Sequence, residues 1–213
     1  MELALFPLHV VLFPGRPLPL HIFEPRYRQL LDDCLAADRR FGVVAIRAGR
    51  EVGADCELFD VGTVAEIESV SMLADGRADI ATRGVQRFRI LELLAPSPYP
   101  KAEVELLEDP PASASDRERA RGLRALLVPY LTGLGAPEEL LERLPADPNG
   151  LAYLAACAVQ VELTDQQRLL ECDSTARRLE ATLAMLRRET SLMRHFGTVA
   201  SLRPPGPGGA ELN

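Results

Sequence analysis

The chain has 213 residues, 47% of them hydrophobic, and a net charge of −7. This length allows one large domain or two small ones, and the hydrophobic fraction excludes global disorder. An acidic chain repels phosphate backbones at long range. Nucleic acid is therefore not expected as a partner unless a local basic face overrides the net charge.

The first residues lack a basic region followed by a continuous apolar run, so we expect neither a signal peptide nor a membrane-spanning segment. The four cysteines form no C-x-x-C pair, and no histidine lies at zinc-ligand spacing from them. We expect no disulfide framework, metal or cofactor. Cys34 and Cys157 lie in apolar helical runs and are expected to be buried free thiols, which fits a cytoplasmic protein.

Residues 1–109 are predicted to form a β subdomain, because short apolar strands alternate there with tight turns. Asp75-Gly76 is a strong hairpin signal. One amphipathic helix is expected over residues 24–39, where Pro25 suits the first turn and apolar residues follow at helical spacing. Six or seven strands and one helix predict a small barrel or folded sheet.

After a linker at residues 109–115 the pattern becomes helical, and residues 113–202 are predicted to form a helical bundle. Ser115 and Glu118 predict a capping box at the start of its first helix. Asp147 is expected to cap a later helix.

The last helix of the bundle is expected from about Asp173 to His195. Its apolar residues are spaced 4-3-4-3 over only about two heptads, which favours packing on its own bundle over an independent coiled coil. Residues 203–213 are rich in Pro and Gly and are expected to form a flexible tail.

Three segments carry a family resemblance. Residues 4–35 run from an apolar strand through Phe-Pro-Gly and Leu-Pro-Leu into a helix. Residues 57–93 contain Val-Gly-Thr-Val-Ala, an Asp-Gly hairpin and Gly-x-x-Arg-Phe-Arg-Ile, and residues 147–189 are a helical stretch that ends in the long helix. In this order the segments, within residues 3–196, resemble the N-terminal domain of Lon proteases.

The resemblance implies an α+β fold, in which a PUA-like β pseudo-barrel with one inserted helix precedes an α-helical bundle with a long C-terminal helix. It also implies a non-catalytic role in recognising exposed or unfolded protein segments for an ATP-driven protease. The motor and protease motifs are absent: there is no G-x-x-x-x-G-K-[ST], G-x-S-x-G or H-E-x-x-H, and Lys101 is the only lysine. We therefore expect a bacterial, cytoplasmic binding module without enzymatic activity.

PUA-like folds also bind RNA, so an RNA-associated protein is the alternative. Arg87 and Arg89 share one strand face near Arg83, whereas Phe88 points to the other face, so no aromatic accompanies them. Acidic residues close in sequence favour ion pairs within the domain over an RNA-binding face. These acidic residues are Asp75, Asp79 and Glu92. A further alternative, an enzyme with an unrecognised site, would require a deep pocket with converging titratable groups.

The candidate binding surface lies in residues 10–23, where prolines interrupt an apolar stretch. Proline leaves groups of a strand edge unpaired, so an extended peptide is expected to add there by β-augmentation. Filling the barrel core is the alternative role for the same side chains, and the sequence leaves both open. The predicted peptide-binding residues are Phe13, Pro14, Leu18, Leu20, Ile22 and Phe23.

The expected partners are unfolded or extended protein segments. The sequence leaves open whether a separate protease or chaperone also binds, and whether the chain forms a homo-oligomer.

Overall fold

A computed structural model describes residues 1–49, 56–95, 98–159 and 161–196. Within them the fold is α+β, as predicted. The strands are β1 (Glu2–Leu8), β2 (Pro17–Ile22), β3 (Arg40–Gly49), β4 (Cys56–Leu58), β5 (Val61–Met72), β6 (Ala78–Leu93) and β7 (Lys101–Leu107). The helices are α1 (Pro25–Ala36), α2 (Ala114–Gly133), α3 (Glu138–Glu142), α4 (Pro148–Ala158), α5 (Leu163–Glu171) and α6 (Thr175–Phe196).

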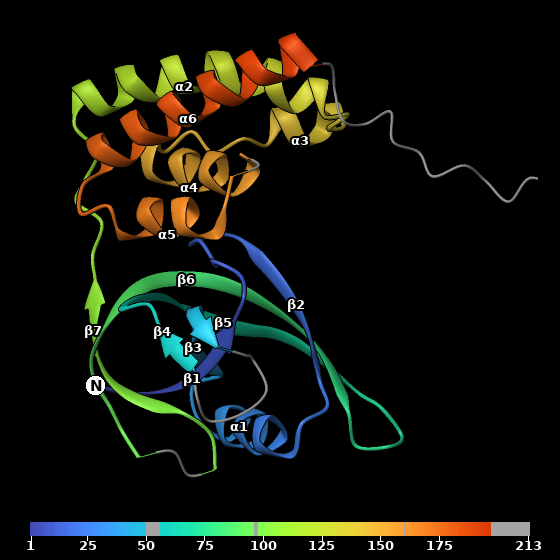
Figure 1. The fold of residues 1–213 in the computed structure, drawn as a ribbon. Coiled ribbons are helices and arrows are strands. Elements are labelled where there is room, and N and C mark those ends of the chain that lie inside the picture. The colour runs from blue at the N-terminus through green and yellow to red at the C-terminus, as the bar shows by residue number, and fades with distance from the viewer. Residues whose placement is uncertain (50–55, 96–97, 160, 197–213) are drawn as a thin grey trace, which may run out of the picture.

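The strands form a barrel and the later helices form a layer on one end of it (Figure 1). The barrel closes because β1 pairs with β7 on one side and, in parallel, with β3 on the other, and the remaining neighbours follow the order β7-β6-β5-β3. Strand β2 adds to the first half of β6, and β4 adds to β3. The predicted small barrel with one inserted helix is confirmed.

Phe88 fills the barrel interior and is fully buried. Two strands can approach its ring closely only because they carry glycine at the contact: a Cβ at Gly62 would lie 2.5 Å from the ring, and one at Gly42 2.8 Å. Helix α1 covers the end of the barrel away from the other helices (Figure 1). It buries Tyr27 and Cys34 at the predicted helical spacing, which confirms both the helix and the buried thiol.

Cys157 corrects the second thiol prediction, because it is exposed. Helix α4 turns its small residues Ala152, Ala155 and Ala156 into the core. Successive helical residues are rotated by about 100°, so Cys157 leaves the buried side although its neighbours are apolar.

Helix α2 begins two residues earlier than the Ser115 prediction implied. Ser113 is the N-cap and Asp116 completes the capping box: the backbone N–H of each donates to the side chain of the other. The prediction for Asp147 is confirmed, since its Oδ2 accepts from the N–H of Gly150 at 2.8 Å.

Helix α6 packs against α2 and α4 of the same chain, as the short apolar seam predicted. Leu179 and Leu186 of that seam are buried in this bundle. Among the described residues, no helix is long and apolar enough to cross a membrane. The predicted flexible tail, residues 203–213, lies outside the described residues.

Candidate functional site

The six predicted peptide-binding residues have different surroundings in the structure. Phe13 and Ile22 are buried, with 1% and 2% of their surface exposed. Pro14, Leu18 and Leu20 are half-buried, and Phe23 is 53% exposed. Of the two roles that the sequence left open, core packing therefore applies to Phe13 and Ile22, while the others remain accessible.

Phe13 lies where the barrel meets the helical layer. Its ring centroid is 6.1 Å from that of Tyr153 in α4, and both belong to a cluster that contains residues of β3, β5 and α5. The preceding carbonyl of Leu12 accepts a hydrogen bond of 2.6 Å from Thr63 Oγ1. Phe13 thus joins the two layers and is not available to a peptide.

Leu20, Ile22 and Phe23 line a small groove of about 150 Å³ between the end of β2 and the end of β1. Phe6 and Tyr27 form part of its wall, with ring centroids stacked 4.1 Å apart. The full lining is Phe6, Pro7, Leu8, Leu20, His21, Ile22, Phe23, Glu24 and Tyr27. We call this site the β1–β2 groove.

The polar residues of the β1–β2 groove stand at its rim and have partners. His21 Nδ1 lies 2.6 Å from Asp79 Oδ1, and the His21 ring stacks on Phe23 with centroids 6.0 Å apart. Glu24 Oε2 accepts a hydrogen bond of 2.9 Å from Arg26 Nε. The interior is left apolar, with an exposed aromatic ring beside it.

Prolines remove N–H donors from the outer edge of β2 and from the end of β1. The N–H of Gly84 in β6 donates to the carbonyl of Arg16, and the β2–β6 register continues from there. The backbone N–H and C=O groups of even-numbered β2 residues therefore point towards β6. The outward positions include Pro17 and Pro19, which have no N–H. In β1, the N–H of Leu5 donates to the carbonyl of Pro100. The backbone of Pro7, two residues further on, therefore points to the same edge of β1. The edges therefore offer carbonyl acceptors but few donors, which limits the predicted β-augmentation.

The three arginines weighed for RNA binding do not form a basic face. Arg83 pairs with Glu68, and Arg87 is 3% exposed and pairs with Asp109 at 2.8 Å. Ion pairs within the chain are confirmed for these two, although their partners are not the acidic residues nearby in sequence. Arg89 alone is exposed without a carboxylate partner among the described residues.

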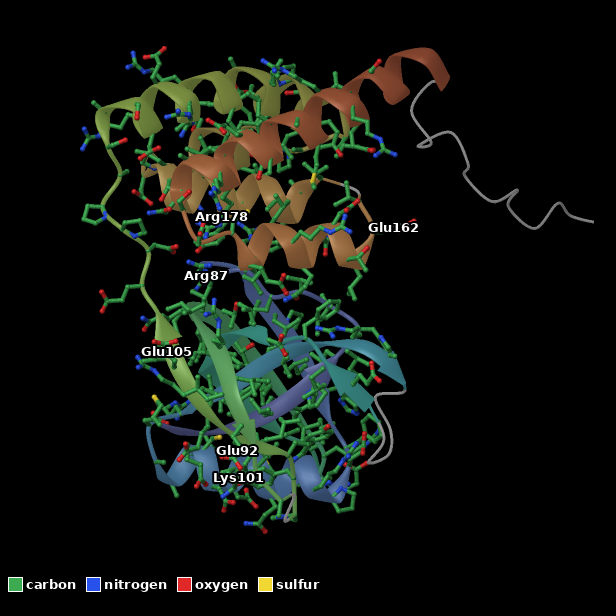
Figure 2. The ribbon with its side chains drawn as sticks, turned by 60° about the vertical axis from the view of Figure 1, so that its left-hand side comes forward. Arg87, Glu92, Lys101, Glu105, Glu162 and Arg178 are labelled. Atoms are coloured by element: carbon green, nitrogen blue, oxygen red, sulfur yellow. The ribbon has the colours of Figure 1, made fainter. Side chains whose placement is uncertain are left out.

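A largely buried polar network joins the barrel and the helical layer, and two of its members, Arg87 and Arg178, are labelled in Figure 2. Arg87 of β6 and Arg178 of α6 both reach Asp109, at 2.8 and 3.4 Å, and the Tyr153 hydroxyl donates to it at 2.6 Å. Both guanidinium groups also bind carbonyls at the end of α5, including that of Cys172. Burial lowers the pKa of Arg178 from its usual range, and burial also raises that of the Tyr153 hydroxyl.

Sequence reasoning missed this network and the β1 side of the groove. Asp109 was assigned to a linker, and Phe6 and Leu8 to an ordinary strand. No local pattern marks these residues, because their partners come from segments more than ten residues away.

Comparison with known proteins decides the family. Residues 2–188 match the ATP-dependent protease La (LON) substrate-binding domain. The chain belongs to this family.

Curated Lon-family relatives include Lon protease 2 of Myxococcus xanthus, which is 31% identical over 202 residues, covering 90% of this chain and 24% of that protein. Lon protease of Escherichia coli K12 is 30% identical, covering 91% of this chain and 25% of that protein. This Lon-family chain thus spans about a quarter of the length of these relatives.

Solved structures agree with the Lon-family assignment. The Lon N-terminal domain protein from Xanthomonas campestris is 29% identical with a TM-score of 0.65, covering 86% of this chain and 98% of that one. The N-terminal domain of Mycobacterium avium complex Lon protease is 19% identical with a TM-score of 0.72, covering 88% and 98%, and shows the shared fold.

Proposed function

We propose that this chain is a substrate-recognition module that binds exposed apolar segments of unfolded or extended proteins in the β1–β2 groove. The observation that carries the proposal is an apolar groove flanked by the exposed ring of Phe23 in a domain of the Lon substrate-binding family. The proposed contact residues are Leu20 and Phe23, with the half-buried Leu18 and Pro14 extending the surface along the chain.

The size of the groove indicates how a client is held. A volume of about 150 Å³ accommodates one large side chain. Burying one Leu or Phe side chain contributes only about 1.5–3 kcal/mol, so a single groove gives weak and unselective binding. The carbonyls of Pro17, Pro19 and His21 on the outer edge of β2 accept N–H groups from an extended backbone of any sequence. Such binding suits recognition of many unfolded clients.

The groove lining supports a role in binding rather than in chemistry. Its histidine and its glutamate are held by Asp79 and Arg26, and no Ser, Thr, Cys or Lys of the described ranges lines it. We infer that the chain is not an enzyme and that its clients pass to a proteolytic or chaperone partner, since the relatives it matches are Lon proteases. We place this activity in the cytoplasm, where free thiols such as Cys34 and Cys157 stay reduced.

Fluorescence anisotropy with a labelled, neutral, apolar peptide tests this proposal. Phe23→Ser is expected to weaken binding at least about fivefold, because one exposed aromatic contact is lost. Leu93→Ser is the matched control: Leu93 is 55% exposed against 53% for Phe23, and it lies at the far end of β6. Equal affinity of wild type and Phe23→Ser would show that the groove does not bind clients. Sedimentation of the free protein distinguishes peptide binding from occupation of the groove by a second copy.

A further inference from the structure

A second cleft, larger and more polar, lies between the barrel and α5, the helix nearest the barrel (Figure 1). Its volume is about 540 Å³, within the usual range of ligand sites. Residues at the end of β3, the start of β5 and the middle of β6 line one side, and α5 lines the other. We call it the junction cleft. Neither the peptide-binding prediction nor the β1–β2 groove involves it.

A β-bulge in the sheet directs the side chain of Arg47 towards the junction cleft. The β3–β4 register shifts between Ile46 and Ala48, so Arg47 is the unpaired residue of a β-bulge. Bulges re-aim a side chain from its regular direction. The Arg47 guanidinium lies over the ring of Phe59, 4.9 Å from its centroid, which fixes the cation at the rim of the cleft.

Arg89 supplies a second cation to the junction cleft. It stands opposite Val61 in the β5–β6 ladder and is exposed. Among the described residues, neither Arg89 nor Arg47 has a carboxylate within ion-pair distance. Arg168 of α5 also lines the cleft, but it already pairs with Asp165 at 2.9 Å. Two guanidinium groups with ten potential N–H donors are therefore available to an anion.

Gln167 adds a buried acceptor to the same lining. The residue is 1% exposed, and its Nε2 donates to the Val61 carbonyl at 2.9 Å and to Glu171 Oε1 at 2.8 Å. Because both of these partners are acceptors, the orientation of the amide is settled. Its Oε1 is buried and has no partner among the described residues. An unmatched buried acceptor is costly, so a ligand that brings an N–H donor is favoured here.

We propose that the junction cleft binds an extended protein segment with an isolated carboxylate, which is held by Arg47 and Arg89, while a backbone N–H of the segment donates to Gln167 Oε1. The inference deepens the proposed function and rests on it: the β1–β2 groove takes apolar side chains, and the junction cleft selects segments that also carry a carboxylate. Asp60 and Glu171 also line the cleft, so they repel an anion with several adjacent charges more strongly than a single carboxylate. A peptide with one isolated carboxylate therefore fits better than nucleic acid.

Anisotropy with labelled peptides lacking apolar residues tests the junction cleft separately from the groove. Three Gly/Ser peptides are compared: one with an internal Asp and an amidated end, one neutral with a free C-terminal carboxylate, and one neutral and amidated. At least one carboxylate peptide is expected to bind at least about tenfold more tightly than the neutral amidated one. The peptide that binds identifies the source of the carboxylate.

The double variant Arg47→Gln/Arg89→Gln is expected to remove this preference. Arg121→Gln/Arg177→Gln removes the same charge from exposed sites on α2 and α6 and is expected to change affinity less than about twofold. The proposal is overturned if all three peptides bind equally or if the Arg47/Arg89 variant keeps the preference for a carboxylate. It is also overturned if a mononucleotide competes more strongly than unlabelled acidic peptide. Phe23→Ser leaves this assay unchanged, so failure of the groove and failure of the cleft are distinguishable.

Discussion

Replacing Asp109 by Asn removes the carboxylate that joins the two layers of the molecule. Arg87 and Arg178 both bind this carboxylate, and their side chains are only 3% and 0% exposed. Two buried guanidinium groups are then left without a counter-ion. Breaking a buried pair in this way costs about 3–5 kcal/mol, and the lower end applies because the Asp109 side chain is 23% exposed. A loss of about 3 kcal/mol corresponds to a fall in Tm of about 6–12 °C for a chain of this size.

Urea unfolding followed by far-UV circular dichroism measures this loss, since the chain has no tryptophan. The control is Glu108→Gln, which removes one charge from the exposed neighbouring residue and is expected to cost less than about 0.5 kcal/mol. Adding Arg87→Met to Asp109→Asn is expected to recover part of the stability, because it removes one orphaned cation. A loss for Asp109→Asn below about 1 kcal/mol would refute the view that this network joins the layers.

Three further predictions concern acid stability, thiol reactivity and the edge of β2. The hydroxyl and backbone N–H of Ser113 lower the pKa of the Asp116 carboxyl, so the stability from these hydrogen bonds is complete above the unfolded pKa of about 4 and is lost as the pH falls through the folded pKa. Asp116→Asn should therefore flatten the fall in urea midpoint between about pH 6 and pH 3. An unchanged slope would contradict this. Burial raises the pKa of the Cys34 thiol to about 11, whereas Cys157 is exposed. Cys157→Ser should therefore remove one fast-reacting thiol from an Ellman titration of the native protein. Loss of the fast-reacting thiol in Cys34→Ser instead would contradict this prediction. Pro19→Ala adds an N–H to the outer edge of β2 and should tighten binding of an extended apolar peptide about two- to tenfold. An unchanged or weaker affinity in anisotropy titrations would show that this edge does not contact the peptide.

Elements whose signals are local could be predicted from the amino-acid sequence. The spacing of Tyr27 and Cys34 after Pro25 predicts α1, because helical periodicity repeats within a few residues. Asp147 predicts the start of α4, since a cap acts on N–H groups two or three residues away. The Asp75-Gly76 turn predicts the β5–β6 hairpin for the same reason, and the ordered set of such segments carried the family resemblance.

The role of each apolar or charged residue depends on contacts that form only in the folded chain. Phe13 and Phe23 belong to one Pro-broken stretch, yet Phe13 meets Tyr153 across the layer boundary and Phe23 stays in solvent beside the groove. Arg87 and Arg89 are two residues apart on one strand, yet Arg87 is buried against carbonyls at the end of α5 and Arg89 stays exposed in the junction cleft. Burial and pairing depend on segments far apart in the chain, and the sequence near a residue does not specify which distant segment will cover it.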